Sequence, residues 1–262
     1  MEEAAAASLP RGASVYITAL PGDDADAVVG AAARLRRAGL NPVPHLGARY
    51  LASEQVLDAL LRRLTAEAGV SQVLVIGGDT DHVSGPFASS LDLLRAGALS
   101  RHGIRRIGLA GYPEPHPRIA AAVLDAALAD KISHAQKDGA EVYVVTQFCF
   151  SPDPIRTWVL RFARRFPGVP VQVGLAGPAH IATLLKYGLA CGIGPSLRAL
   201  RRNPSLGRLA AEASPAPIIE ALAQDPTLAP HVSQFHFFTF GGVRRTAAWI
   251  RDFASHHRTV QA

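Results

Sequence analysis

Apolar runs and helical patterns alternate along most of this chain. The runs are rich in valine, isoleucine and leucine and end in glycine or polar residues, as buried parallel strands do. Between them, apolar residues recur at the spacing of one helix face, and such alternation is typical of α/β proteins with a parallel sheet. We expect strands at Ser14–Leu20, Pro42–Leu46, Val73–Ile76, Ile107–Ala110, Val142–Phe148, Val171–Leu175, Leu189–Ile193 and Ser233–Phe240.

Capping residues and glycines mark the expected helices. Asp23, Asp24 and Asp26 open the first helix, which ends near Gly39, and Ser53 is the expected N-cap of the second. Further helices are expected at about 89–99 and 118–137, over Ile155–Phe162 and Ile181–Leu185, as two or three short helices within 196–224, and over Val243–Phe253.

The number of these units favours a closed barrel over an open sheet. Eight β/α units follow one another without a long break, and 262 residues is close to the length of about 250 that is typical of a (β/α)8 barrel. We therefore predict an α/β fold of the (β/α)8 TIM-barrel type. One domain, residues 13–262, would follow a flexible N-terminal segment, residues 1–12.

Composition narrows the class of protein. A hydrophobic content of 48% with 18% charged residues argues for a globular chain and against disorder. No apolar run is long enough to span a membrane, so we expect no membrane partner. The first residues, MEEAAAASLPRG, carry acids where a signal peptide carries basic residues, which favours a cytoplasmic protein.

Charge and cysteine content exclude two kinds of site. The net charge of +6 comes largely from arginine pairs that are scattered along the chain with few aromatics between them, so we expect no nucleic-acid partner. The simplest reading is an arginine-rich composition with solvated faces, and attraction of anionic small molecules is the alternative. Cys149 and Cys191 have neither a disulfide framework nor a metal-ligand spacing, so we expect no metal site.

Polar residues collect where the apolar runs end. The densest corner is Arg106–Pro117, in which Tyr112, Glu114 and His116 stand among three prolines. Asp79 and Gln147 end two other runs. Because the sites of parallel α/β folds lie at the carboxyl ends of the strands, we expect the functional residues there.

The order of these corners resembles the methylenetetrahydrofolate reductase family, whose members are flavoenzymes on a (β/α)8 barrel. The resemblance covers nearly the whole chain, and four motifs follow one another in the order of that family. They are Gly78-Asp79, Gly111-Tyr112-Pro113-Glu114-Pro115-His116-Pro117, Thr146-Gln147-Phe148 and Phe235-His236-Phe237-Phe238-Thr239.

The resemblance implies roles for two polar residues at the substrate. Asp79 matches the aspartate that lies near the flavin and holds the aminopyrimidine edge of the folate, a task for a carboxylate that accepts two hydrogen bonds. Gln147 matches the glutamine that contacts folate or the nicotinamide ring. The structural alternatives are that Asp79 caps a loop and that Gln147 satisfies loop backbone groups.

The resemblance also implies a flavin site. Tyr112 and His116 match the flavin-binding corner, and Ser89 matches the segment that contacts the flavin from a helix start. Asp125 and Lys131 fall near the positions that hold the ribose and the phosphates. The alternative for Lys131 is a solvated surface lysine. Glu114 is similar to a glutamate of the family, with bracing of the turn as its alternative.

Thr18, Phe238 and the pair Gly241-Gly242, which replaces a polar pair, depart from the family pattern. The family has a glutamate at the end of strand one that acts as an acid toward the folate nitrogen, and Thr18 stands in its place. A threonine hydroxyl does not donate a proton near neutral pH as a tuned carboxylic acid does. Phe238, which we assign to substrate binding, stands where a tyrosine is common. Glu114, Asp23 or a bound water are the candidate replacements for the acid.

We therefore expect an FAD-dependent oxidoreductase that interconverts 5,10-methylenetetrahydrofolate and 5-methyltetrahydrofolate, with oxidation of the methyl form as one option for its direction. NADH is a candidate electron donor or acceptor. The alternatives are a non-catalytic folate- or flavin-binding subunit that requires a partner protein, and a (β/α)8 enzyme of unrelated chemistry. For the oxidoreductase we expect a small folate as the binding partner. The sequence leaves both a homo-oligomer and a partner subunit as alternatives for its assembly.

Overall fold

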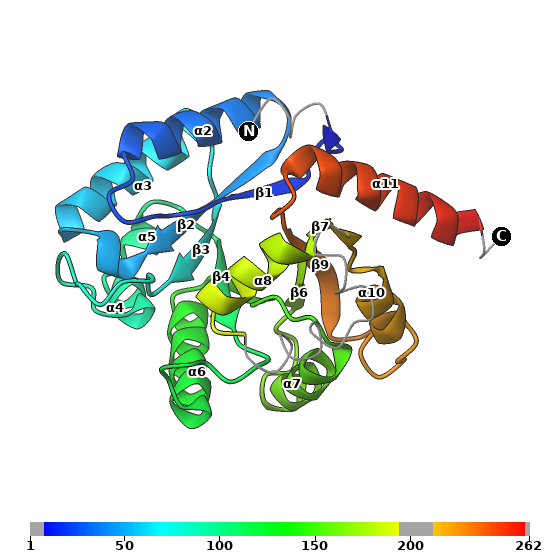
Figure 1. Cartoon of the computed structure of the whole chain (residues 1–262). Helices are drawn as coiled ribbons and strands as arrows, with labels where there is room; N and C mark the ends of the chain where they lie inside the picture. The colour runs from blue at the N-terminus through cyan, green and yellow to red at the C-terminus, as the bar shows by residue number, and fades with distance from the viewer. Residues whose placement is uncertain (1–7, 194–211, 260–262) are drawn as a thin grey trace. The chain divides into compact units, whose positions relative to one another are not determined.

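The structure is a computed structural model that describes residues 8–193 and 212–259 of the chain (Figure 1). The chain forms two compact units. Unit 1 comprises Met1–Ala110 and Asp125–Tyr143, and unit 2 comprises Gly111–Leu124 and Val144–Ala262.

Unit 1 is built on parallel strands that follow each other in chain order. Strands β1 (Ser14–Ile17), β2 (Asn41–Gly47), β3 (Gln72–Ile76) and β4 (Arg106–Gly111) pair as neighbours, and the first half of β5 (Glu141–Thr146) follows β4. The central positions of β3 and β4 are buried on both faces, which is why these strands read as continuous apolar runs.

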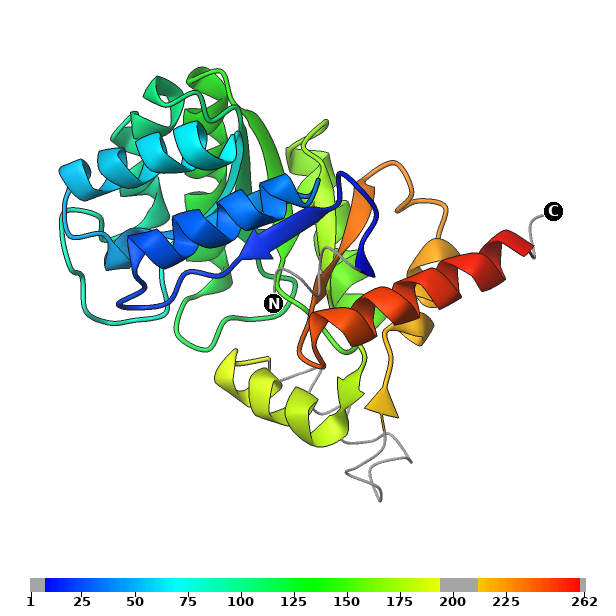
Figure 2. The same ribbon diagram turned by 90° about the horizontal axis from the view of Figure 1, so that it is seen from above.

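The helices of unit 1 include the expected ones, of which the helix expected from about 118 begins at Ala121. They are α2 (Ala25–Arg37), the 3-10 turn η1 (Ala48–Tyr50), α3 (Glu54–Ala68), α4 (Ser90–Arg95), α5 (Ala98–Arg101) and most of α6 (Ala121–Lys137). Asp24 and Ser53 are N-caps whose side chains accept backbone N–H groups of α2 and α3. Helices α2 and α3 lie side by side (Figures 1 and 2).

One expected helix is two. The pattern predicted a single helix at about 89–99, but α4 ends at Arg95 and α5 begins at Ala98. Gly97 lies between them with φ of +65°, in the left-handed region that ends a helix. The apolar spacing continues across this break, so the pattern alone could not locate it.

A buried polar network lies inside unit 1. The Tyr143 side chain is fully buried, and its hydroxyl accepts a hydrogen bond from Nε2 of Gln72 at 2.8 Å and one from the Tyr16 hydroxyl at 3.2 Å. Asn41 extends the network, donating to Oε1 of Gln72 at 3.3 Å. Gly108 lies against the Tyr143 ring, and any side chain there would overlap it. Burial raises the pKa of Tyr143.

Unit 2 contains the end of β4, the second half of β5, β6 (Val171–Ala176) and β9 (Val232–Phe238), again in parallel. Thr146 joins β5 to β6, since its Oγ1 accepts the Gly174 N–H at 2.8 Å. Gly174 approaches the Thr146 carbonyl so closely that a Cβ would collide with it.

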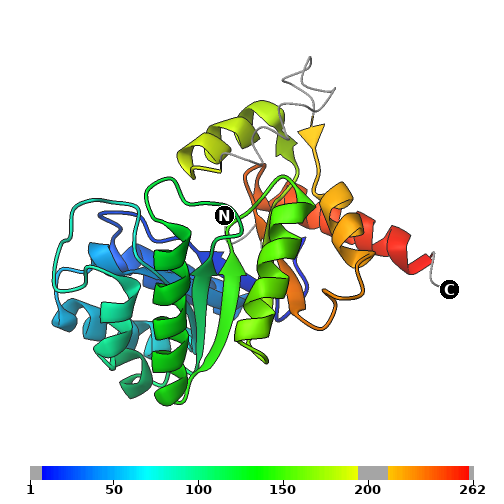
Figure 3. The same ribbon diagram turned by 90° about the horizontal axis from the view of Figure 1, so that it is seen from below.

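The helices of unit 2 are α7 (Pro152–Arg165), α8 (Ile181–Ala190), α10 (Ala216–Ala223) and α11 (Val243–Thr259). Helices α7 and α10 lie side by side (Figures 1 and 3), and Arg156 reaches from α7 to Asp225 just past α10 with an N–O distance of 2.8 Å. The four apolar residues that the sequence assigned to the core face of α7 are all buried, namely Ile155, Trp158, Val159 and Phe162.

The expected seventh strand, Leu189–Ile193, is wrong. Helix α8 continues to Ala190, and the N–H groups of Cys191 and Ile193 donate to carbonyls of that helix's last turns. The short run is apolar because it is the end of a helix. A short strand lies before α8 instead, where β7 (Ala179–His180) pairs antiparallel with β8 (Glu212–Ala213). Most of the short helices expected within 196–224 fall outside the described residues, and α10 lies in the described part.

The described chain is thus an α/β protein with seven parallel strands. This confirms the fold class and is consistent with a TIM-like fold, while closure into a barrel and the presence of eight units stay predictions. Across the part of the chain that the structure describes, no helix is both long and apolar enough to cross a membrane.

Candidate functional site

In unit 1, the loop that follows β3 carries Asp79 and is held by η1. The Asp79 N–H donates to the Tyr50 hydroxyl oxygen at 2.6 Å, and the Asp79 side chain is exposed. Arg49 binds the loop before this point by donating its N–H to the Gly77 carbonyl at 3.0 Å, and after it through the carbonyls of Thr80 and Ala88, at 2.8 and 2.9 Å. The backbone of Asp79 is therefore fixed while its residue faces solvent, which suits a residue that meets a ligand.

Lys131, also in unit 1, is more buried than its sequence suggested. It lies on α6 among partly buried positions, and the loss of hydration on burial lowers its pKa. Within residues 8–193 and 212–259 no hydrogen bond or ion pair involves its ammonium group. A partly buried cation of this kind suits an anionic ligand. Asp125 lies six residues earlier on the same helix.

Ser89 and Thr18, the other two candidates in unit 1, have ordinary surroundings. Ser89 is the N-cap of α4 and shares a capping box with Asp92, whose Oδ2 accepts from the Ser89 N–H at 2.8 Å and from its hydroxyl at 2.9 Å. Thr18 is exposed just beyond the end of β1. Near it, Oδ2 of Asp23 accepts the Leu20 N–H at 2.6 Å, so this carboxylate serves a turn.

In unit 2, the corner after β4 brings Tyr112 and His116 together. Their rings meet edge to face with centroids 5.4 Å apart. Nδ1 of His116 accepts the Arg118 N–H at 3.1 Å, so the proton of the neutral imidazole is on Nε2. Glu114 is 8% exposed in the same corner. The corner thus presents a fixed phenol and a fixed imidazole.

Gln147 is tied to this corner by its backbone. Its N–H donates to the Gly111 carbonyl at 2.8 Å, and its side-chain Oε1 accepts the N–H of Phe148 at 3.1 Å. The side-chain oxygen of Gln147 therefore satisfies a backbone group of the loop, as the structural alternative for this residue expected. Its amide nitrogen makes no hydrogen bond to any residue that the structure describes. Two N–H donors are thus left for a carbonyl of a ligand.

Phe238, at the end of β9, lies in an aromatic cluster of unit 2. Its ring is 5.2 Å from that of Phe148 and 4.9 Å from the imidazole of His236. Phe240 and Tyr187 continue the cluster, stacked with centroids 4.3 Å apart. Burial lowers the pKa of His236 to about 4, so this imidazole is neutral at physiological pH.

Within each unit, the candidates that the structure brings together are therefore a subset of those expected. Tyr112, His116 and Gln147 share the corner after β4. Asp79 and Ser89 belong to one loop that Arg49 spans. Arg49, Tyr50 and His236 were not expected at a site. The sequence signal for Arg49 and Tyr50 was their place directly after a strand. His236 lies in the motif Phe235-His236-Phe237-Phe238-Thr239, where no role was expected for it.

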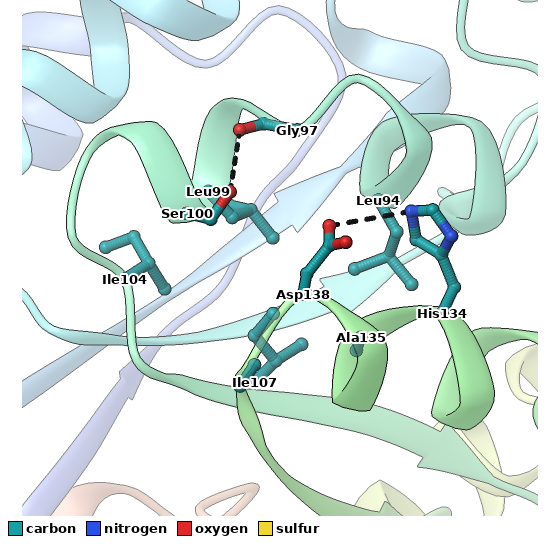
Figure 4. A pocket seen from close by; sticks show the side chains of 10 residues that line it. Leu94, Gly97, Leu99, Ser100, Ile104, Ile107, His134, Ala135 and Asp138 are labelled. Carbon is teal, nitrogen blue, oxygen red and sulfur yellow. Dashed lines mark hydrogen bonds and ion pairs between the residues drawn. The ribbon is translucent and has the colours of Figure 1, made fainter.

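A small pocket in unit 1 is a poor candidate (Figure 4). It lies near the start of β4 and the end of α6, lined by apolar residues with Ser100, His134 and Asp138, whose imidazole and carboxylate are 3.6 Å apart. The space open to the centre of a water molecule is about 10 Å³, enough for one water. It is far too small for a pterin or a flavin. Groups of three or more potential metal ligands are absent from the described residues.

Comparison with known proteins gives a family. The chain is similar, at 14% identity, to a solved alcohol dehydrogenase from the archaeon Thermococcus sibiricus complexed with 5-hydroxy-NADP, over 87% of this chain and 96% of that one. The TM-score of 0.30 is too low for this likeness to carry an argument. The family model described as methylenetetrahydrofolate reductase matches residues 3–187, well over half of the chain. This chain belongs to the methylenetetrahydrofolate reductase family.

Proposed function

We propose that the protein is a flavin-dependent oxidoreductase that interconverts 5,10-methylenetetrahydrofolate and 5-methyltetrahydrofolate. The observation that carries this proposal is the family match over residues 3–187. That stretch includes Asp79, Lys131 and Gln147, the polar residues with the strongest case for meeting a ligand. Family membership supports a folate-related reductase, and the direction and the cofactor belong to the proposal.

Asp79 and Gln147 are the proposed pterin-binding residues. An exposed carboxylate on a fixed backbone can accept two hydrogen bonds from adjacent N–H groups of an aminopyrimidine. Gln147 offers complementary donors, because its Oε1 is already engaged with Phe148. Phe238 would contribute an aromatic face to the substrate from the cluster at the end of β9.

We propose a flavin dinucleotide as the cofactor, because individual residues of the chain have side chains that suit it. Lys131 is a partly buried cation whose pKa burial has lowered, and a diphosphate would supply the negative charge that stabilises its protonated form. We assign the ribose to Asp125 and the flavin-side contacts to Ser89, Tyr112 and His116. When bound, FAD supplies the hydride chemistry, with NADH proposed as the external donor or acceptor.

Because Thr18 stands where the family has a glutamate, we also propose a direction for the reaction. Of the replacements for the family's acid, Asp23 is exposed and engaged in a turn, whereas Glu114 is buried in the corner after β4. Burial disfavours the charged form of a carboxyl group. Oxidation of 5-methyltetrahydrofolate places a different demand on an acid at this position, and we propose it as the direction that tolerates a threonine.

A second function is favoured by the same threonine. Without a carboxyl group at position 18, the chain could bind folate or flavin and require a partner protein for turnover. The two functions differ in whether the purified chain converts a folate without a partner protein. The test is incubation of the purified chain with FAD, NADH or an artificial acceptor and each folate, followed by chromatographic analysis of the folates. Conversion by the chain alone supports the enzyme, and binding without conversion supports the subunit.

A further inference from the structure

We infer that Arg49 and Tyr50 are positioning residues for Asp79, and that together they set how firmly the protein holds the pterin. This inference rests on the proposed function, because it assigns Asp79 to the substrate. Both residues belong to η1, the single turn that follows β2. We call them the η1 clasp. Neither needs to contact a ligand to have this effect.

Arg49 grips the loop after β3 at several points. Its N–H donates to the Gly77 carbonyl at 3.0 Å, and its carbonyl accepts the Ser84 N–H at 3.0 Å. Its guanidinium donates to Thr80 through one terminal nitrogen and to Ala88 through Nε. Hydrogen bonds from a charged donor to a carbonyl are stronger than neutral ones. One arginine therefore joins the beginning, the middle and the end of this loop.

Tyr50 acts at Asp79 itself. Its hydroxyl oxygen accepts the Asp79 N–H at 2.6 Å. Its ring lies between Gly47 and Gly78, and a Cβ on Gly47 would overlap it, while one on Gly78 would come within 3.0 Å of it. Gly78 has φ of +100°, a conformation that residues with a side chain rarely adopt. The two glycines thus provide the space that the tyrosine needs to reach Asp79.

The loop after β3 also packs against the backbone that directly follows η1. Gly85 packs so tightly on the carbonyls of Leu51 and Ala52 that any side chain would collide with them. An exposed loop with polar and glycine residues is normally mobile, and ordering it costs free energy when a ligand binds. The clasp orders the backbone beforehand, so that the Asp79 carboxylate meets a pterin with less entropy to lose.

The test uses conservative variants of the full chain. Tyr50→Phe keeps the ring between the two glycines and removes only the acceptor oxygen. Arg49→Lys keeps the charge and loses the second donor. Arg37→Ala is the matched control, since Arg37 is an arginine that donates to Ala33 of its own helix. We measure the Kd of 5-methyltetrahydrofolate, the Kd of FAD, the thermal midpoint, and amide hydrogen exchange over residues 77–88.

We expect Tyr50→Phe to weaken folate binding roughly three- to tenfold, with faster exchange over 77–88 and with the FAD Kd and thermal midpoint unchanged. In the double variant Tyr50→Phe/Asp79→Ala the folate effect of Tyr50→Phe should vanish, because Tyr50 acts through the Asp79 carboxylate. A merely structural role would give additive losses.

Additive losses, or faster exchange with unchanged folate affinity, would overturn the positioning role while leaving the proposed function intact. A wild-type chain that binds no folate would instead overturn the proposed function and the inference with it.

Discussion

The side-chain amide of Gln72 donates a hydrogen bond of 2.8 Å to the hydroxyl oxygen of Tyr143, a side chain that is 1% exposed. Tyr143→Phe removes the acceptor and leaves a buried amide donor unsatisfied. We expect the free energy of unfolding to fall by about 1–3 kcal/mol, measured by urea denaturation. Tyr187→Phe is the control, since Tyr187 is 41% exposed and keeps its stacking on Phe240. Equal stability of both variants would contradict the importance of this network.

His236 makes stability depend on pH. Burial lowers its folded-state pKa from 6.5 to about 4, so between these values the unfolded chain binds a proton that the folded chain does not. The free energy of unfolding should therefore fall as the pH drops from about 6.5 to about 4, by at most about 3 kcal/mol from this group. His236→Phe should flatten that part of the curve. Parallel curves for the two proteins would remove His236 as the cause.

Replacing Lys131 should weaken flavin binding without lowering the stability of the chain. Lys131→Met removes a partly buried cation, so the chain without flavin should be as stable as the wild type or more so. The Kd of FAD, followed by the quenching of flavin fluorescence, should rise roughly tenfold or more because the phosphates lose a charged donor. Lys137→Met, on the exposed last turn of the same helix, should change neither quantity. An unchanged FAD Kd in Lys131→Met would take Lys131 out of the flavin site.

Replacing Asp79 should change the binding of folate and leave the binding of FAD unchanged. Asp79→Ala should weaken folate binding by about tenfold or more, since two hydrogen bonds to a carboxylate are lost, while FAD is retained. Asp81→Ala, an exposed carboxylate two residues further along the same loop, is the matched control. Both Kd values come from calorimetric titration. Equal folate affinity in wild type and Asp79→Ala would exclude Asp79 from the substrate site.

A substitution at position 18 tests whether the missing carboxyl group limits the reduction of the folate. If Thr18 is the only deficit, Thr18→Glu should raise the rate of methylenetetrahydrofolate reduction by tenfold or more, within the range that a general acid contributes. Thr18→Gln provides the same size without the proton and should give no gain. The measurement is kcat under anaerobic conditions with an excess of electron donor. If both variants behave like wild type, further residues differ from what reduction requires.

Much of the fold could be predicted because local signals and tertiary packing agree in it. Ser53 caps α3, and the apolar stripe of α7 that contains Trp158 is buried as its spacing indicated. The failures have local causes. Gly97 splits a helix without breaking the apolar pattern, and the run that ends at Ile193 has the composition of a strand but the hydrogen bonds of a helix end.

The candidate site was less predictable because its contacts involve the backbone. Arg49 and Tyr50 bind carbonyl and N–H groups of a loop, and such groups leave no trace in residue types. The burial of Lys131 depends on packing around α6 that periodicity does not give. Asp79 and Gln147 could be named because each ends an apolar run and stands in a motif that resembles the family.

The most direct test of the account is the visible spectrum of the purified protein, recorded anaerobically before and after the addition of 5-methyltetrahydrofolate or NADH. The proposed function predicts bound oxidised flavin that bleaches with at least one of these donors, and 5,10-methylenetetrahydrofolate among the products when the methyl form is used. Protein that retains no flavin after reconstitution with FAD, or flavin that stays oxidised with both donors, would contradict it.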